Sequence, residues 1–159
     1  MSILVLGLGN MLMSDDSIGV RAVQRLQQDY RTPAGVTILD GGTLGLDLLP
    51  YIEAADELLI IDALEMQAEP GSLFRLEGEA VPRAFASKLS VHQMGLQDLL
   101  AVAELQGYAP QKLVVHGIQA GSIEMKLELS PAVAASMDEL NDAIINELRD
   151  WGIALEKAA

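Results

Sequence analysis

The sequence predicts a single three-layer α/β/α domain, in which helices cover both faces of a twisted, mostly parallel five-stranded sheet. Short apolar runs alternate with amphipathic segments through the first sixty residues, which is the pattern of parallel strands joined by crossover helices. The chain has 159 residues, and half of them are hydrophobic. One domain over residues 1–159 with a real hydrophobic core is therefore expected.

The first half of the chain predicts three parallel strands and two helices. Residues 3–6 are apolar and lead into Gly7 and Gly9, as at the end of a buried strand that turns sharply. Residues 17–30 place Val20, Val23 and Leu26 near one face of a helix. Further strands are expected at 36–39 and 57–61, with a helix at 45–52 that Pro50 weakens.

The second half predicts two more strands and two helices. No helix separates a strand at 71–76 from the strand before it, so this strand is expected at an antiparallel edge. Residues 77–90 are polar, contain Pro82, and are expected to form a loop with at most a helical turn. A helix at about 93–106, a strand at 112–115 and a final helix at 131–151 follow, the last with Ser130 as its N-cap.

Composition excludes several classes of function. A net charge of −13 argues against nucleic acid or an anionic membrane as partner. The absence of cysteine excludes disulfides, thiolate metal sites and a cysteine nucleophile. No apolar run is long enough for a transmembrane helix and no basic segment precedes the first strand, so a cytoplasmic location is expected. A monomer is expected as well, although the sequence indicates little about oligomeric state.

Three aspartates follow the ends of the first three predicted strands: Asp16, Asp40 and Asp62. Because the carboxyl ends of parallel strands share one edge of a sheet, these carboxylates are expected to converge there. Like charges that are buried together need a cation or a proton to offset them. His92 lies in a loop that can reach this edge, and two carboxylates with one imidazole suit a borderline divalent metal.

Each of these residues also has a structural interpretation. Asp16 could cap the helix that follows it, as Asp62 and His92 could cap theirs. Asp40 precedes two glycines and could be a turn residue. His116, at the end of a core strand, is interpreted as a packed histidine and not as a ligand.

The first loop also has to be compared with phosphate-binding loops and with known hydrolase motifs. The dinucleotide motif Gly-x-Gly-x-x-Gly would require glycine where Leu12 stands, and Asp15 with Asp16 places negative charge where phosphate needs free N–H groups. The paired carboxylates favour a cation, or a group that contains one. No His-Glu-x-x-His or Gly-x-Ser-x-Gly motif occurs, and Asp40-Gly-Gly differs from the Asp-Thr/Ser-Gly of aspartic proteases.

Five segments of the chain match motifs of one known family: Gly7-Leu-Gly-Asn-Met-Leu-Met-Ser-Asp-Asp16, Leu39-Asp-Gly-Gly-Thr43, Ile60-Ile-Asp62-Ala63, Ser90-Val-His92-Gln-Met-Gly95 and Gly117-Ile-Gln119. Through them the sequence resembles the nickel–iron hydrogenase maturation endopeptidases over nearly the whole chain. Each segment is weak alone, but their order is specific. Two departures, Ser17 where the family usually has glycine and Ala120 where it often has proline, touch no proposed ligand.

This resemblance implies an endopeptidase that removes the C-terminal extension of a hydrogenase large-subunit precursor after nickel insertion. It implies a metal-binding trio of Asp16, Asp62 and His92, and it implies that the metal is nickel already seated in the substrate, with no tightly bound metal of the enzyme's own. Asp40, on a neighbouring strand end, is predicted to act in cleavage as a general base or by positioning the scissile peptide. The alternative is a non-catalytic module that handles nickel or binds a nucleotide.

Overall fold

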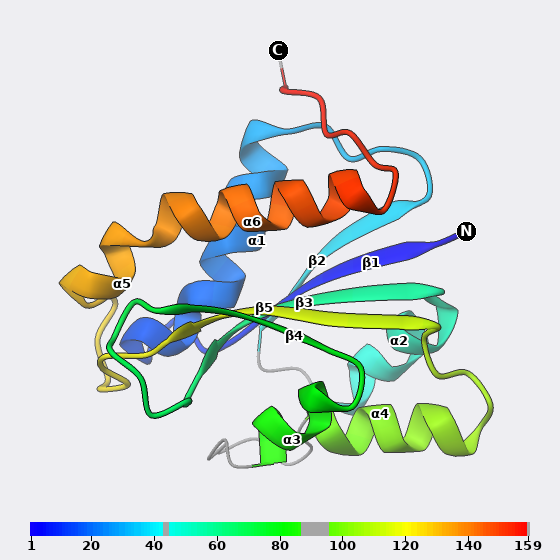
Figure 1. Cartoon of the computed structure of the whole chain (residues 1–159), viewed down its shortest axis with the longest axis horizontal. Coiled ribbons are helices and arrows are strands. Elements are labelled where there is room, and N and C mark those ends of the chain that lie inside the picture. Colours follow the sequence, from blue (N-terminus) through cyan, green and yellow to red (C-terminus); the bar gives the residue numbers. More distant parts are fainter. Residues whose placement is uncertain (43–44, 87–95, 159) are drawn as a thin grey trace.

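The computed structural model describes residues 1–42, 45–86 and 96–158 (Figure 1). Its sheet has the strand order β2-β1-β3-β5-β4. The first four strands in this order are parallel, and β4 at the edge is antiparallel to β5, as the sequence predicts. The strands are β1 (Ile3–Leu8), β2 (Val36–Gly42), β3 (Glu57–Leu64), β4 (Leu73–Glu77) and β5 (Lys112–Gln119).

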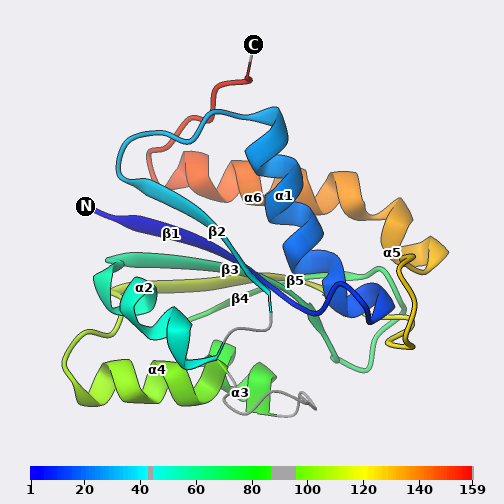
Figure 2. The same ribbon diagram turned by 180° about the vertical axis from the view of Figure 1, so that it is seen from behind.

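Helices cover both faces of the sheet, so the three predicted layers are confirmed (Figures 1 and 2). One face is covered by α1 (Ile18–Asp29), α5 (Pro131–Ala135) and α6 (Met137–Asp150). The other face is covered by α2 (Leu49–Ala54), α3 (Ala80–Ala86) and α4 (Leu96–Leu105). Two short 3-10 turns, η1 (Ser14–Ser17) and η2 (Leu46–Leu48), precede α1 and α2.

The core consists of two apolar clusters, one on each face of the sheet. Val5 and Leu59 belong to the cluster beneath α1 and α6, and Leu4 and Leu58 belong to the cluster that faces α2 and α4. Successive residues of a strand point to opposite faces, so both alternating sets of β1 and β3 are buried. This explains why these strands are continuous apolar runs, as expected for central parallel strands.

Several predicted boundaries are wrong for identifiable reasons. β1 continues through Gly7, because Gly7 pairs with Asp40 of β2 and Ile61 of β3. The last helix is divided at Ser136 into α5 and α6. The segment expected to be a loop with a helical turn contains the seven-residue helix α3. The predicted second helix is a 3-10 turn over its first part and continues as α2 from Leu49, which has Pro50 in its first turn, where its missing N–H costs nothing.

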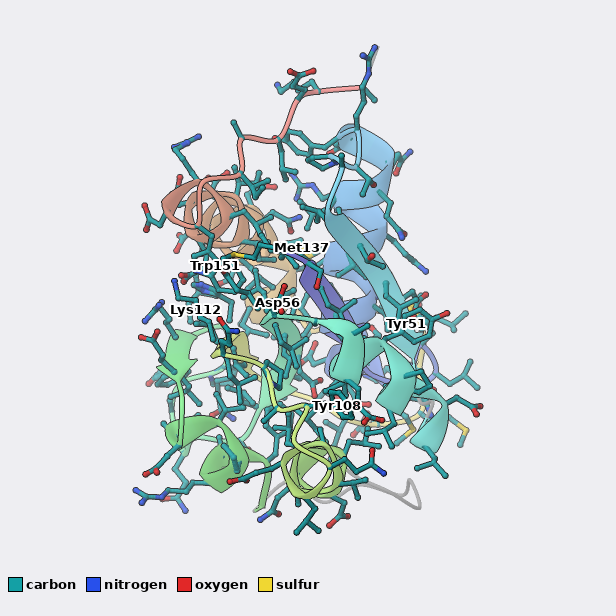
Figure 3. All side chains as sticks on the ribbon, turned by 90° about the vertical axis from the view of Figure 1, so that its right-hand side faces the viewer. Tyr51, Asp56, Tyr108, Lys112, Met137 and Trp151 are labelled. Atoms are coloured by element: carbon teal, nitrogen blue, oxygen red, sulfur yellow. The ribbon has the colours of Figure 1, made fainter. Side chains whose placement is uncertain are left out.

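The C-terminal end of the described chain is attached to the body of the domain. Lys112 Nζ at the start of β5 lies 5.1 Å from the centroid of the Trp151 ring that follows α6 (Figure 3). The final segment runs beside the end of α1, where Tyr30 and Lys157 form an isolated bridge. None of the described helices is long and apolar enough to span a membrane.

Candidate active site

Close backbone packing brings the start of α1 onto the carboxyl ends of β1 and β3. A Cβ atom at Gly19 would lie 2.1 Å from the carbonyl oxygen of Ile61 and 2.4 Å from that of Leu8. A Cβ at Gly7 would lie 2.3 Å from the carbonyl oxygen of Gly19. Only glycine leaves room for these approaches. They bring η1, with Asp16, into contact with the end of β3.

The loop between β1 and η1 folds around the carboxylate of Asp16. Gly9 has φ +138°, and a Cβ there would lie 1.8 Å from the backbone oxygen of Asp16. The N–H of Asn10 donates to Asp16 Oδ2 at 2.9 Å, and the side chain of Asn10 accepts from Leu12 N at 2.9 Å. The bond from Asn10 thus reaches the Asp16 carboxylate from the β1 side of η1. The N-cap position of α1 is Ser17, not Asp16, and the Ser17 side chain makes no capping bond.

The same bonds argue against a phosphate site in this loop. The N–H groups of Gly9 and Met13 donate to the carbonyl oxygens of Gly42 (3.0 Å) and Asn10 (3.1 Å). Those of Asn10 and Leu12 are also used within the loop. A phosphate site requires backbone N–H groups that point toward the ligand. In this loop those N–H groups are bonded within the protein, so the dinucleotide interpretation is not supported.

Asp62 lies at the same end of the sheet as Asp16. It is 2% exposed, and its Oδ1 accepts the N–H of Ala63 at 2.8 Å. Since Asp62 alternates with Leu58 and Ile60, its side chain is on the face that α2 and α4 cover. β3 continues to Leu64, so no helix begins here and the capping interpretation of Asp62 is wrong.

The third predicted ligand, His92, lies outside the described residues. Within residues 1–42, 45–86 and 96–158, no three His, Asp or Glu side chains form a potential metal site. The described part therefore brings Asp16 and Asp62 to one edge, and the trio stays a prediction.

Asp15, the other half of the acidic pair, is a structural residue. It is fully buried, and its Oδ2 accepts hydrogen bonds from the N–H groups of Gly121 and Ser122 and from the Ser130 hydroxyl, each at 2.7 Å. Its Oδ1 accepts the N–H of Ser130 at 2.7 Å. Burial raises the pKa of Asp15, but these four bonds outweigh it and hold the pKa below the usual range. The expectation that both carboxylates attract a cation is wrong for Asp15.

Asp40 is separated from Asp62 by the sheet itself. It lies within β2, not in a turn, and it is exposed. It alternates with Val36 and Ile38, which pack beneath α1, and its Oδ2 accepts a bond from Gln24 of α1 at 3.3 Å. β1 lies between the strands of the two aspartates, a separation of about 10 Å. The role of Asp40 in cleavage stays a prediction.

His116 is packed, as the sequence predicts. It is 8% exposed, and its Nε2 lies 2.8 Å from Glu147 Oε1 on α6. Glu147 also accepts bonds from Arg75 (2.6 Å) and Trp151 (2.9 Å). The Arg75 bond, with help from His116, lowers the pKa of Glu147 to about 2 against the effect of burial. This cluster holds α6 to β4 and β5.

Gln119, quoted above only as part of a motif, organises the loop after β3. Its Oε1 accepts the N–H groups of Met66 (2.7 Å) and Ala68 (3.3 Å), and its Nε2 donates to Glu65 at 2.9 Å. No feature of the sequence indicated this role, because it depends on the pairing of β3 with β5. The contact fixes the chain just beyond Asp62.

The edge therefore presents hard oxygen donors on a rigid support. Asp16 lies in η1 and Asp62 lies in the central strand β3. The backbone at both positions is therefore fixed before any ligand binds. Such donors bind divalent cations, and an added imidazole would favour a transition metal. A metal held here by three groups would retain open coordination positions for another molecule.

Comparisons with known proteins identify the family. A family model described as Hydrogenase maturation protease matches residues 20–147. The chain is 41% identical over 154 residues to the Hydrogenase 2 maturation protease of Escherichia coli (strain K12), covering 96% of this chain and 94% of that protein. It is 42% identical over 159 residues to the Hydrogenase expression/formation protein HupD of Rhodobacter capsulatus, covering 99% and 76%.

A solved structure gives the same result. The hydrogenase maturating endopeptidase HybD from E. coli superposes with a TM-score of 0.93 at 40% identity, covering 99% of this chain and 98% of that one. These proteins are peptidases, which contradicts the alternative of a non-catalytic module. The chain therefore belongs to the hydrogenase maturation protease family and is a peptidase.

Proposed function

We propose that this endopeptidase removes the C-terminal extension of a nickel–iron hydrogenase large-subunit precursor after nickel has been inserted. In this proposal the nickel in the precursor is the recognition signal. Asp16 and Asp62, together with His92, complete the coordination of that nickel. Asp40 contacts the peptide or its attacking water from the α1 face.

The observation that carries the proposal is the meeting of η1 with the carboxyl end of β3. Gly7, Gly9 and Gly19 permit backbone approaches that no other residue allows, and the result is that Asp16 and Asp62 share one edge of the sheet. Both side chains are oxygen donors on rigid backbone. They can therefore meet a metal that a second protein brings, without rearrangement of the fold.

The chemistry of the donors supports a metal that belongs to the substrate. Two carboxylates and an imidazole lack thiolate, and the chain has no cysteine to supply one. The large subunit that the family resemblance implies offers four cysteine sulfurs, which are softer donors and hold nickel more strongly. The enzyme's three groups then act as additional ligands to a nickel already bound.

Recognition of this kind discriminates loaded from empty precursor. A precursor with nickel gains the three metal contacts, and one without nickel lacks them. Specificity is the difference between the two binding free energies. Cleavage would thus follow metal insertion and not precede it.

Incubation with purified nickel-loaded precursor, followed by mass spectrometry, tests the proposal. The expected result is a shortened large subunit and one released C-terminal peptide. The matched control is the Asp62→Asn variant, which keeps the size of the side chain and removes its charge. An intact precursor after prolonged incubation with folded wild-type enzyme would contradict the proposed function.

A further inference from the structure

Four exposed apolar side chains lie on two loops at the same edge of the sheet as Asp16. They are Leu12 (56% exposed), Ile123 (58%), Met125 (82%) and Leu127 (62%), here called the apolar edge surface. Leu12 lies in the loop that folds around the Asp16 carboxylate, and the others lie in the segment that follows β5. In Figure 2 this segment, drawn in yellow, lies beside the blue start of α1. Apolar side chains gathered in this way mark interaction surfaces.

Hydrogen bonds from η1 hold the two loops side by side. The N–H of Ser14 donates to the carbonyl oxygen of Lys126 at 2.8 Å, and its hydroxyl donates to that of Glu128 at 2.7 Å. Ser14 has φ 50°, a left-handed conformation that residues other than glycine adopt at a cost. The two bonds to the neighbouring loop offset this cost.

Both ends of the segment after β5 are attached to Asp15. Its carboxylate accepts bonds from Gly121 and Ser122 at one end and from Ser130 at the other. Arg21 of α1 donates to the carbonyl oxygen of Leu127 between them. A loop without regular structure is thus fixed with its apolar side chains toward solvent. Ordering before contact lowers the entropic cost of binding.

The charge around the apolar edge surface limits the kind of molecule that can bind there. The segment contains Glu124 and Glu128 against one lysine, Lys126, and the whole chain has a net charge of −13. Surfaces that bind anionic membranes combine apolar groups with lysine and arginine, which is the opposite pattern. Nucleic acid is disfavoured for the same reason. A protein partner fits this surface best.

We propose that the apolar edge surface docks an apolar segment of the hydrogenase large-subunit precursor, next to the metal that Asp16 contacts. This inference rests on the proposed function, because that function brings the precursor to Asp16. Asp15, the residue before Asp16, holds the surface in place. A protein that presents its metal to Asp16 would therefore lie beside the apolar edge surface.

Charge substitutions with a matched control test this docking. Met125→Glu and Ile123→Glu place a carboxylate in the surface, where an apolar partner would have to desolvate it. Each is expected to raise the KM for nickel-loaded precursor about tenfold or more while kcat at saturation stays close to wild type. Leu105→Glu, on the 87% exposed last residue of α4, introduces the same charge at the far end of the domain and should leave KM unchanged. An unchanged KM for both surface variants would overturn the proposal.

Crosslinking provides a second readout that does not depend on cleavage. Because the chain has no cysteine, Met125→Cys creates a unique thiol for a photoreactive maleimide. Illumination with nickel-loaded precursor should join position 125 to the precursor, whereas Leu105→Cys should give no such product. A crosslink only between two copies of this chain would overturn the proposal in favour of self-association.

The two experiments also separate this proposal from the proposed function. If the wild-type enzyme leaves the loaded precursor uncut, the proposed function fails. A crosslink from position 125 to the precursor would still support docking in that case, and its absence would refute docking as well.

Discussion

The carboxyl edge of the sheet and the space beneath α6 both contain buried carboxylates, but they are stabilised differently. Beneath α6, Glu147 is paired with the guanidinium of Arg75 and bonded to His116 and Trp151. At the edge, Asp15 accepts four bonds from neutral N–H and hydroxyl groups. The first arrangement joins secondary-structure elements, and the second orders loops.

From this difference we expect the Glu147 cluster to contribute mainly to stability and the carboxyl edge mainly to cleavage. Glu147 of α6 connects the side chains of Arg75 on β4, His116 on β5 and Trp151 at the end of α6. Its loss should therefore lower the free energy of unfolding. Asp16 and Asp62 at the edge are proposed to contact nickel in the precursor, so their loss should lower cleavage. The following predictions test whether the two regions can be separated in this way.

Asp62→Asn should have the largest effect on cleavage. Losing a residue that only orients a metal ligand costs about 10–100-fold, and losing a ligand itself should cost more. We therefore expect a fall of more than about 100-fold in kcat/KM for nickel-loaded precursor, with little change in Tm. Calorimetry beside the cleavage assay checks both parts. A comparable loss of stability would mean that the edge also holds the fold together.

Asp40→Asn should slow cleavage by at most about 100-fold, the lower end of what general acid–base groups contribute. The effect is limited because Asp40 is exposed and lies on the α1 face, away from Asp62. Precursor binding, measured by surface plasmon resonance, should be retained. Unchanged kcat would assign Asp40 a structural role in β2.

Glu147→Ala should mainly affect stability, by about 2–4 kcal/mol, because it removes bonds to a charged group and leaves buried donors without a partner. The lower half of this range applies if Arg75, whose side chain is 44% exposed, turns to solvent. The kcat of the folded variant should match that of wild type. A large loss of kcat at full folding would connect the region beneath α6 to the site.

Acid titration should show the same dependence on Glu147. Its folded-state pKa is about 2 against a usual 4.5, so its stabilising effect is complete above about pH 4.5 and is lost as the pH falls toward 2. Asp15, whose pKa is also lowered, adds to the loss in this acid range. Urea unfolding at several pH values should therefore show a steep loss below pH 4.5, and Glu147→Gln should make that slope shallower.

Asp15→Asn should lower stability less than Glu147→Ala does, by about 1–3 kcal/mol, since the amide nitrogen would face N–H donors. It should also raise KM, because the loop of the apolar edge surface loses its anchor. This variant connects the two regions, because Asp15 lies at the carboxyl edge but its hydrogen bonds hold loops together. Reduced stability with an unchanged KM would mean that Asp15, like Glu147, contributes only to stability.

Much of the fold could be predicted because its signals are local. Continuous apolar runs such as residues 57–61 indicate central parallel strands, and the absence of a helix before residues 71–76 indicates the antiparallel edge. Helix ends were less predictable. Ser130 is the N-cap of α5 with Pro131 in the first turn, as predicted, but its hydroxyl donates to Asp15, which is distant in sequence, and not to the helix.

The site could be predicted only in part, for a related reason. Strand ends indicate the positions of Asp16 and Asp62, because parallel strands share an edge. The roles of Asp15 and Gln119 depend on loops more than fifty residues away, which no local pattern reports. The face on which Asp40 lies depends on the register of β2 and on α1.

The central claim is that nickel in the precursor is what the carboxyl edge recognises. The most direct measurement compares nickel-loaded and nickel-free precursor at equal concentration with metal-free wild-type enzyme, following the released peptide over time. If nickel is the recognition signal, the loaded precursor is cleaved rapidly and the empty one little or not at all. Equal rates for the two precursors would contradict it, and Asp16 and Asp62 would then need another role.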